Sequence, residues 1–285
     1  MKKLLALLLA LVFCLGVLAS CNEGGEKYVS EISKEGFVLD NLPEDEGYVY
    51  FDHIKPPDNA RPESKTIAFN SKDYTSTRYM NTENDYRYGA AIKRDYYYAR
   101  DGVSFALETG TDRLVYFGQS IDIRQETALG DTSSLTVAQE IAKQYLGDPS
   151  LYDLKTETLY VSENGIDYGT KYTYTKRALG YSTTDFLCVS ITNSGKIYEL
   201  SIGQTGVFDA LEEFDKSKVE ESIKDIIYST YEKDGAKITG QQPRGSRLVV
   251  LENGKIVLAS NYYIWIKDAN GLETLEHSTV LTYIE

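Results

Sequence analysis

The segment VSITNSGKIYELSI, at residues 189–202, decides the predicted fold. Val189 and Ile191 alternate with polar residues before its centre, and Leu200 and Ile202 do so after it. This alternation predicts two β-strands, and the Gly-Lys pair between them marks a turn. The segment is therefore read as a hairpin with one apolar face, which another layer must cover.

A helix that could cover this face is predicted upstream, over residues 136–146. Its apolar side chains recur at helical spacing and form one stripe: Ala138, Ile141, Ala142, Tyr145 and Leu146. Thr136 and Gln139 have the spacing of a capping box, and Gly147 and Pro149 end the pattern.

A second helix of the same kind is predicted from Ser217, with Ser217 and Glu220 as its capping box and Asp234-Gly235 after its end. Its apolar stripe is Val219, Ile223, Ile226, Ile227 and Tyr231. The two helix starts are 81 residues apart, and three or four strand-like runs follow each helix. These runs are 155–161, 171–176, 186–191 and 196–202 after the first helix, and 247–251, 256–267 and 279–284 after the second.

The repeated pattern predicts an α+β fold, in which tandem units each pack one helix on a curved antiparallel sheet. A β-rich N-terminal region precedes the two units, because residues 28–124 contain no comparable helix. The predicted division is a lipoprotein signal peptide at 1–20, a tether at 21–27, a β-rich unit at 28–130, and helix-and-sheet units at 131–208 and 209–285.

The order of helix, strand, long strand and a closing hairpin at 189–202 resembles PepSY-type domains, the small cystatin-like modules of secreted and lipid-anchored bacterial proteins. The resemblance covers residues 131–208 best and 209–285 more loosely. Thr192-Asn193 departs from the family, where an acidic residue is common before the turn. The resemblance implies extracytoplasmic regulation, binding or peptidase inhibition, and it supplies no catalytic residue.

The start of the chain has the pattern of an exported protein. Lys2 and Lys3 precede an apolar run, Leu4 to Ala19, whose helical length of about 24 Å is short of a hydrocarbon core of roughly 30 Å. Leu18-Ala-Ser-Cys21 resembles the bacterial lipobox. The resemblance implies that Cys21 is acylated with diacylglycerol, which anchors the protein to the extracytoplasmic face of the cell membrane. A secreted protein with a chance cysteine at the cleavage site is the alternative.

The charge of the chain excludes one class of partner. Without residues 1–20 it carries 28 basic and 43 acidic residues, a formal charge of −15. Such a surface repels phosphate backbones, so nucleic-acid binding is not expected. Cys188 is then the only other cysteine of the mature chain, and its strand-like surroundings predict a small buried hydrophobe. A nucleophilic role would need His53 or His277, the only histidines, and neither lies in a recognisable motif.

Tyrosine is abundant, with 24 residues, and it gathers in the N-terminal region. Tyr86, Tyr88, Tyr96 and Tyr98 are the candidate ligand-binding residues, because tyrosine offers an apolar face with a polar tip. Tyrosine is also a favoured strand residue, and alternate positions must face opposite sides of a sheet. A structural role therefore competes with binding at each of these positions.

No phosphate-binding loop, dinucleotide fingerprint or serine elbow occurs in the sequence. Asp268 to Glu273 has acidic residues like a calcium loop but lacks the EF-hand spacing, so a strand turn is expected there and no metal. Neither a cofactor nor a catalytic residue is predicted.

The sequence thus predicts a lipid-anchored protein of the cell envelope that is not an enzyme and binds a protein or peptide at a shallow sheet edge or face. The alternative is a solute- or glycan-binding lipoprotein that uses a Tyr-rich surface. An envelope hydrolase with two catalytic acids is a third possibility, which would require a cleft with paired carboxylates.

Overall fold

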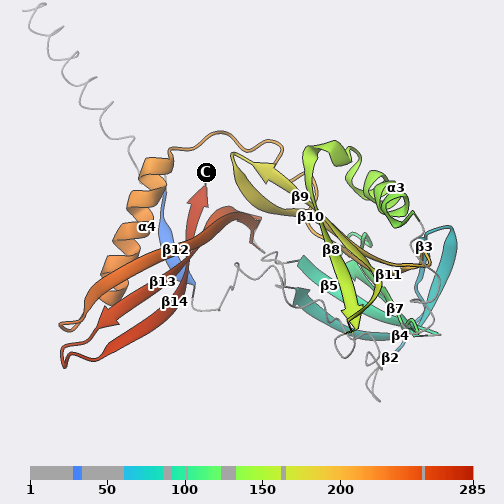
Figure 1. Cartoon of the computed structure of the whole chain (residues 1–285), viewed down its shortest axis with the longest axis horizontal. Coiled ribbons are helices and arrows are strands. Elements are labelled where there is room, and N and C mark those ends of the chain that lie inside the picture. The colour runs from blue at the N-terminus through green and yellow to red at the C-terminus, as the bar shows by residue number, and fades with distance from the viewer. Residues whose placement is uncertain are drawn as a thin grey trace, which may run out of the picture.

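The computed structural model describes residues 28–33, 61–85, 92–100, 102–122, 133–161, 165–251 and 254–284. Most of this part of the chain is β-structure, and Figure 1 shows long strands with one helix lying against each half of the molecule. The described strands join one mixed sheet of fourteen strands.

The described residues of the N-terminal part form seven strands: β1 Ser30–Ser33, β2 Arg61–Pro62, β3 Thr66–Phe69, β4 Lys72–Asp85, β5 Ile92–Ala99, β6 Val103–Glu108 and β7 Leu114–Gln119. The following elements are α3 Ser134–Leu146, the short 3-10 helix η2 Pro149–Leu151, β8 Tyr152–Val161, β9 Ile166–Ala178, β10 Tyr181–Thr192 and β11 Ile197–Ile202. The last are α4 Lys216–Tyr231, β12 Lys237–Val250, β13 Ile256–Lys267 and β14 Glu273–Ile284.

The predicted fold class, tandem α+β units with a separate sheet under each helix, is wrong. The main path of the sheet runs β1-β14-β13-β12-β10-β11-β7-β6-β5-β4-β2 without a break, and β9 and β8 extend it from β10. Two pairings make it continuous. Leu200 of β11 lies opposite Phe117 of β7, and Thr183 of β10 pairs in parallel with Leu248 of β12. The fold is therefore mainly β, with two α-helices in the described part of the chain.

The hairpin at 189–202 is confirmed. Val189 lies opposite Leu200, and a bulge between Ser190 and Ile191 shifts the register near the turn. Gly195 has a φ of 83°, a left-handed conformation that glycine adopts without strain, and its N–H donates to the Thr192 carbonyl oxygen.

Both predicted helices are present, but their predicted caps are wrong. In α3 the N-cap residue is Ser133, and its side chain makes no capping hydrogen bond. In α4 the N-cap residue is Asp215, whose carboxylate accepts the N–H groups of Ser217 and Lys218. Asp215, two positions before the predicted N-cap Ser217, takes the role because a carboxylate also complements the positive end of the helix.

Each helix buries its apolar stripe on a different part of the sheet. Ala138, Ile141 and Ala142 of α3 pack into a core that is centred on β6, β7 and β9–β11. A second core lies between α4 and strands β12–β14, and it includes Val219, Ile223 and Ile227 of the helix. No described helix is both long enough and apolar enough to cross a membrane.

Candidate functional site

Strand β8 is the candidate site because it lies at a long edge of the sheet, with no described strand on its outer side (Figure 1). It pairs with β9 over its whole length, from Tyr152 opposite Lys176 to Val161 opposite Ile166. No other described strand pairs with it. An edge strand presents unpaired N–H and C=O groups on its outer side, so a further strand can add to it through main-chain hydrogen bonds.

The side chains of β8 divide into two rows on opposite faces of the sheet. One row contains Tyr152, which is buried, and Leu154, which is 43% exposed. Tyr160 lies opposite Asp167 of β9, just beyond a bulge of β9 at Tyr168, and is 52% exposed. These exposed apolar side chains lie next to the open edge, where they would contact a strand that adds to it.

The other row of β8 carries alternating charges at Asp153, Lys155 and Glu157. The Lys155 ammonium lies 3.2 Å from a Glu157 carboxylate oxygen, and Asp153 accepts a 2.7 Å hydrogen bond from Arg177 Nε on β9. All three side chains are at least partly exposed. Exposed ion pairs of this kind add little stability, so the charges chiefly define which neighbouring strand is electrostatically compatible.

Buried hydrogen bonds fix the start of β8. The Tyr152 hydroxyl donates a 2.8 Å hydrogen bond to Asp185 Oδ1 on β10. The other oxygen, Oδ2, accepts a 2.8 Å hydrogen bond from the Gly206 N–H. Asp185 thus connects the edge strand to the segment that leads from β11 to α4, and Lys176 pairs with Asp209 of the same segment.

Burial raises the pKa values of both Asp185 and Tyr152. Loss of hydration raises the pKa of Asp185, and the hydrogen bonds from Gly206 and Tyr152 and the charge of Lys176 oppose the rise. Loss of hydration, together with the hydrogen bond to Asp185, also raises the pKa of the Tyr152 hydroxyl. The tyrosine therefore stays protonated and keeps donating at neutral pH.

The raised pKa of Asp185 predicts a specific pH dependence of stability. The native protein binds a proton at Asp185 that the unfolded chain has already released, so stability falls as pH rises from about 3.9 through the folded-state pKa. The Asp185→Asn variant should lack this contribution. Urea midpoints measured at intervals from pH 3.5 to pH 7 should then fall more steeply for the wild type than for the variant. Parallel curves would contradict the prediction.

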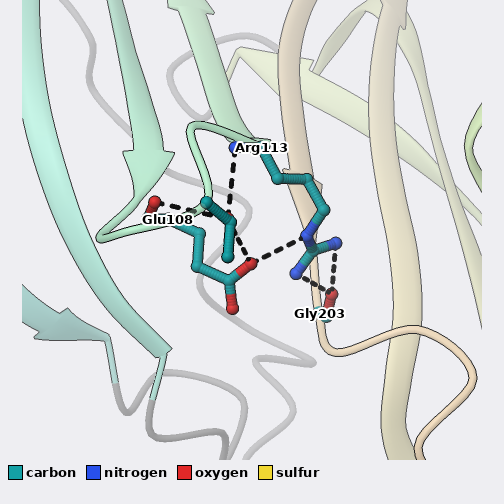
Figure 2. A network of polar contacts seen from close by, with 4 residues as sticks. Glu108, Arg113 and Gly203 are labelled. Atoms are coloured by element: carbon teal, nitrogen blue, oxygen red, sulfur yellow. Dashed lines mark hydrogen bonds and ion pairs between the residues drawn. The ribbon is translucent and has the colours of Figure 1, made fainter.

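A second network, between Arg113, Glu108 and Gly203, holds the start of the same segment (Figure 2). The Arg113 guanidinium donates two hydrogen bonds, of 3.1 and 3.2 Å, to the Gly203 carbonyl oxygen. Its Nε donates to Glu108 Oε2 at 3.0 Å, and Thr111 donates to the same oxygen at 2.9 Å. The turn between β6 and β7 is therefore tied to the first residue after β11.

The candidate tyrosines of the N-terminal region lie in different environments. Tyr96 is buried, with its ring 5.9 Å from that of Tyr116, and Tyr98 is half-buried. Tyr86 and Tyr88 lie outside the described residues, as do Cys21 and His53. A ligand site that includes these tyrosines stays a prediction.

Three further sequence expectations can be compared with the structure. Cys188 is buried as expected, and burial raises the pKa of its thiol to about 11, so it is protonated at neutral pH. Asp268 closes the expected strand turn, because its Oδ1 accepts the N–H groups of Asn270 and Leu272. His277 is exposed on β14, with its ring 4.3 Å from that of Tyr263. No cluster of three or more metal-binding side chains occurs in the described residues.

Sequence reasoning predicted a strand at 155–161 but did not identify it as the candidate site. The run DLKTET at 153–158 carried a signal, because alternating charges at one face are typical of exposed edge strands. Its position at an edge depends on which strands pair, and the sequence pattern does not specify that.

No protein-family model, no curated protein and no solved structure matches this chain.

Proposed function

We propose that this protein is a lipid-anchored, extracytoplasmic binding protein that holds an extended segment of another envelope protein on the open edge of β8. The role is non-catalytic, and Cys21 supplies the membrane anchor. The observation that carries the proposal is the ten-residue edge of β8, which is paired on one side only among the described strands.

The contacts that hold β8 in place favour a binding role for its edge. Its first residue is fixed by the buried hydrogen bond from Tyr152 to Asp185, and its partner strand β9 is paired on both sides. A rigid edge loses little conformational entropy when a peptide adds to it, and the main-chain hydrogen bonds are independent of the peptide sequence. Selectivity must then come from the side chains of β8.

The chemistry of β8 specifies a partner strand. A segment that adds antiparallel should place a cation opposite Glu157, an anion opposite Lys155 and a cation opposite Asp153, with apolar residues between them. The peptide core Lys-Val-Glu-Val-Lys satisfies this order. The net charge of the chain, −13, also favours a partner with excess positive charge.

This complementarity predicts how model peptides bind. A terminally blocked Lys-Val-Glu-Val-Lys peptide should bind the full-length protein in detergent about tenfold more tightly than Glu-Val-Lys-Val-Glu. The expected difference arises because three cross-strand charge pairs, each contributing roughly 0.2–1 kcal/mol, change sign. Calorimetric titration measures the affinities, and amide exchange should show protection at residues 152–161.

A charge reversal supplies the matched control. The Lys155→Glu variant should lose about threefold in affinity for Lys-Val-Glu-Val-Lys and regain it for Lys-Val-Lys-Val-Lys, since one pair changes sign in each case. Lys233→Glu, at an exposed position beyond the end of α4, should change neither affinity. Equal binding of the two original peptides, or protection outside β8, would refute the proposal.

A further inference from the structure

A second exposed surface lies on the outer half of the three-stranded ribbon formed by β12, β13 and β14 (Figure 1). Ile264 and Ile266 of β13 point toward α4 and belong to its core. Tyr263 and Trp265 alternate with them along the strand, so they lie on the face away from α4. This face carries no described helix.

The register of the ribbon places side chains in three rows on this face. Each row contains one residue from β12, one from β13 and one from β14, in that order. The rows are Lys237, Lys267 and Glu273; Gly240, Trp265 and Leu275; and Gln242, Tyr263 and His277. Strand β12 has a bulge at Arg244, between Pro243 and Gly245. We refer to these nine residues and Arg244 as the ribbon platform.

Trp265 lies across the backbone of β12. A Cβ atom added at Gly240 would be only 3.3 Å from Cε3 of the indole, so the missing side chain leaves room for the ring over the strand. Leu275, on the other side of Trp265, is 46% exposed, and Trp265 itself is partly exposed. One indole face is supported by the sheet, and the ring retains surface open to solvent.

The next row extends this aromatic surface with polar groups. The Tyr263 ring centre lies 4.3 Å from that of His277, and the Arg244 guanidinium carbon lies 4.7 Å above the Tyr263 ring. Gln242, His277 and Arg244 are all exposed. The row therefore offers an aromatic face with amide, imidazole and guanidinium groups at its margin.

The charge of the platform is opposite to that of the chain. Lys237, Lys267 and Arg244 are cations, and Glu273 is the single carboxylate among the platform residues, whereas the full chain has a formal charge of −13. Such a local reversal of sign attracts an anionic ligand to this face and not to its surroundings.

From these features we propose that the ribbon platform binds an acidic glycan. The flat C–H face of a pyranose ring stacks on an aromatic ring such as the indole of Trp265, and hydroxyl groups pair with side chains such as Gln242 and His277. The cations would then pair with the carboxylates of uronic-acid units. This site is separate from the β8 edge and does not depend on the function proposed for it.

The chain's one tryptophan makes the test specific, because Trp265 is the only source of indole fluorescence. The full-length protein is titrated with trigalacturonate, with neutral cellotriose and with hexaglutamate. The proposal expects a saturable fluorescence change with trigalacturonate. The affinity for cellotriose should be at least fivefold weaker, and high salt should weaken the binding of trigalacturonate. Arg244→Ala should lower the affinity at least fivefold.

Arg61→Ala is the matched control, because Arg61 also lies over a tyrosine ring, 4.8 Å from the centre of Tyr79, but on β2. This variant should bind trigalacturonate like the wild type. No saturable change at millimolar trigalacturonate, equal binding of cellotriose, or tighter binding of hexaglutamate would each overturn the proposal. Equal losses in Arg244→Ala and Arg61→Ala would also overturn it.

Discussion

Replacing Gly203 with alanine is expected to lower the free energy of unfolding by about 3 kcal/mol. A Cβ atom at this position would lie 2.1 Å from the Thr184 carbonyl oxygen and 2.6 Å from the Phe186 ring. Both neighbours belong to β10, at the centre of the sheet, and Gly203 also accepts the two hydrogen bonds from Arg113. The backbone cannot move away without breaking this connection, so the overlap must be relieved by distorting β10.

Urea denaturation followed by circular dichroism measures this effect, with Gly110→Ala as the control. Gly110 has a φ of 89° but no atom within 4 Å of an added Cβ, so its substitution should cost only the roughly 1 kcal/mol of a left-handed backbone. Equal losses for the two variants would show that the close approach of Gly203 to β10 does not determine stability.

Replacing Cys21 with alanine is expected to move nearly all of the protein from the membrane fraction to the soluble fraction. Two acyl chains give stable anchoring, since each buried CH₂ contributes about 0.8 kcal/mol and one chain alone binds only reversibly. Fractionation of the cells, with metabolic labelling by a palmitate analogue, measures both location and acylation.

Cys188→Ala provides the comparison, because Cys188 is buried and its substitution leaves the proposed acylation site intact. This variant should stay membrane-bound and labelled. Continued labelling and membrane association of the Cys21→Ala variant would end the lipoprotein proposal, whereas loss of both would leave the β8 proposal to be tested separately.

Local features of the fold could be predicted from the sequence. The stripe of α3, including Ala138 and Ile141, repeats every three or four residues, and the hairpin at 189–202 alternates every two. Both signals lie within one short stretch of the sequence. The predicted helix caps at Thr136 and Ser217 were wrong, but each lay only a few residues from the N-cap in the structure.

The arrangement of the sheet could not be predicted, and this explains the wrong fold class. The pairing of β7 with β11 and the parallel contact of β10 with β12 join residues far apart in the chain. Periodicity shows that a strand has an apolar face, but it does not show which strand lies beside it. Two repeated patterns therefore suggested two sheets where a single sheet continues.

The same limit applies to both proposed binding surfaces. The alternating charges of β8 are visible in the sequence, yet only the pairing shows that the strand lies at an edge. Trp265 and Tyr263 are likewise visible as alternate residues, but Gly240 and His277 join them only through the register of the ribbon. The N-terminal tyrosines gave a stronger compositional signal, and Tyr96 among them is buried.

The most direct test of the β8 proposal is site-specific photo-cross-linking in the protein's own cells. A benzoylphenylalanine residue is placed at Thr156, in the middle of the open edge, or at Ser229, on the exposed side of α4. The proposal predicts one dominant adduct from Thr156, with the cross-link mapped by mass spectrometry to a single extended segment of the partner, and no such adduct from Ser229. The same set of weak adducts from both positions would contradict it.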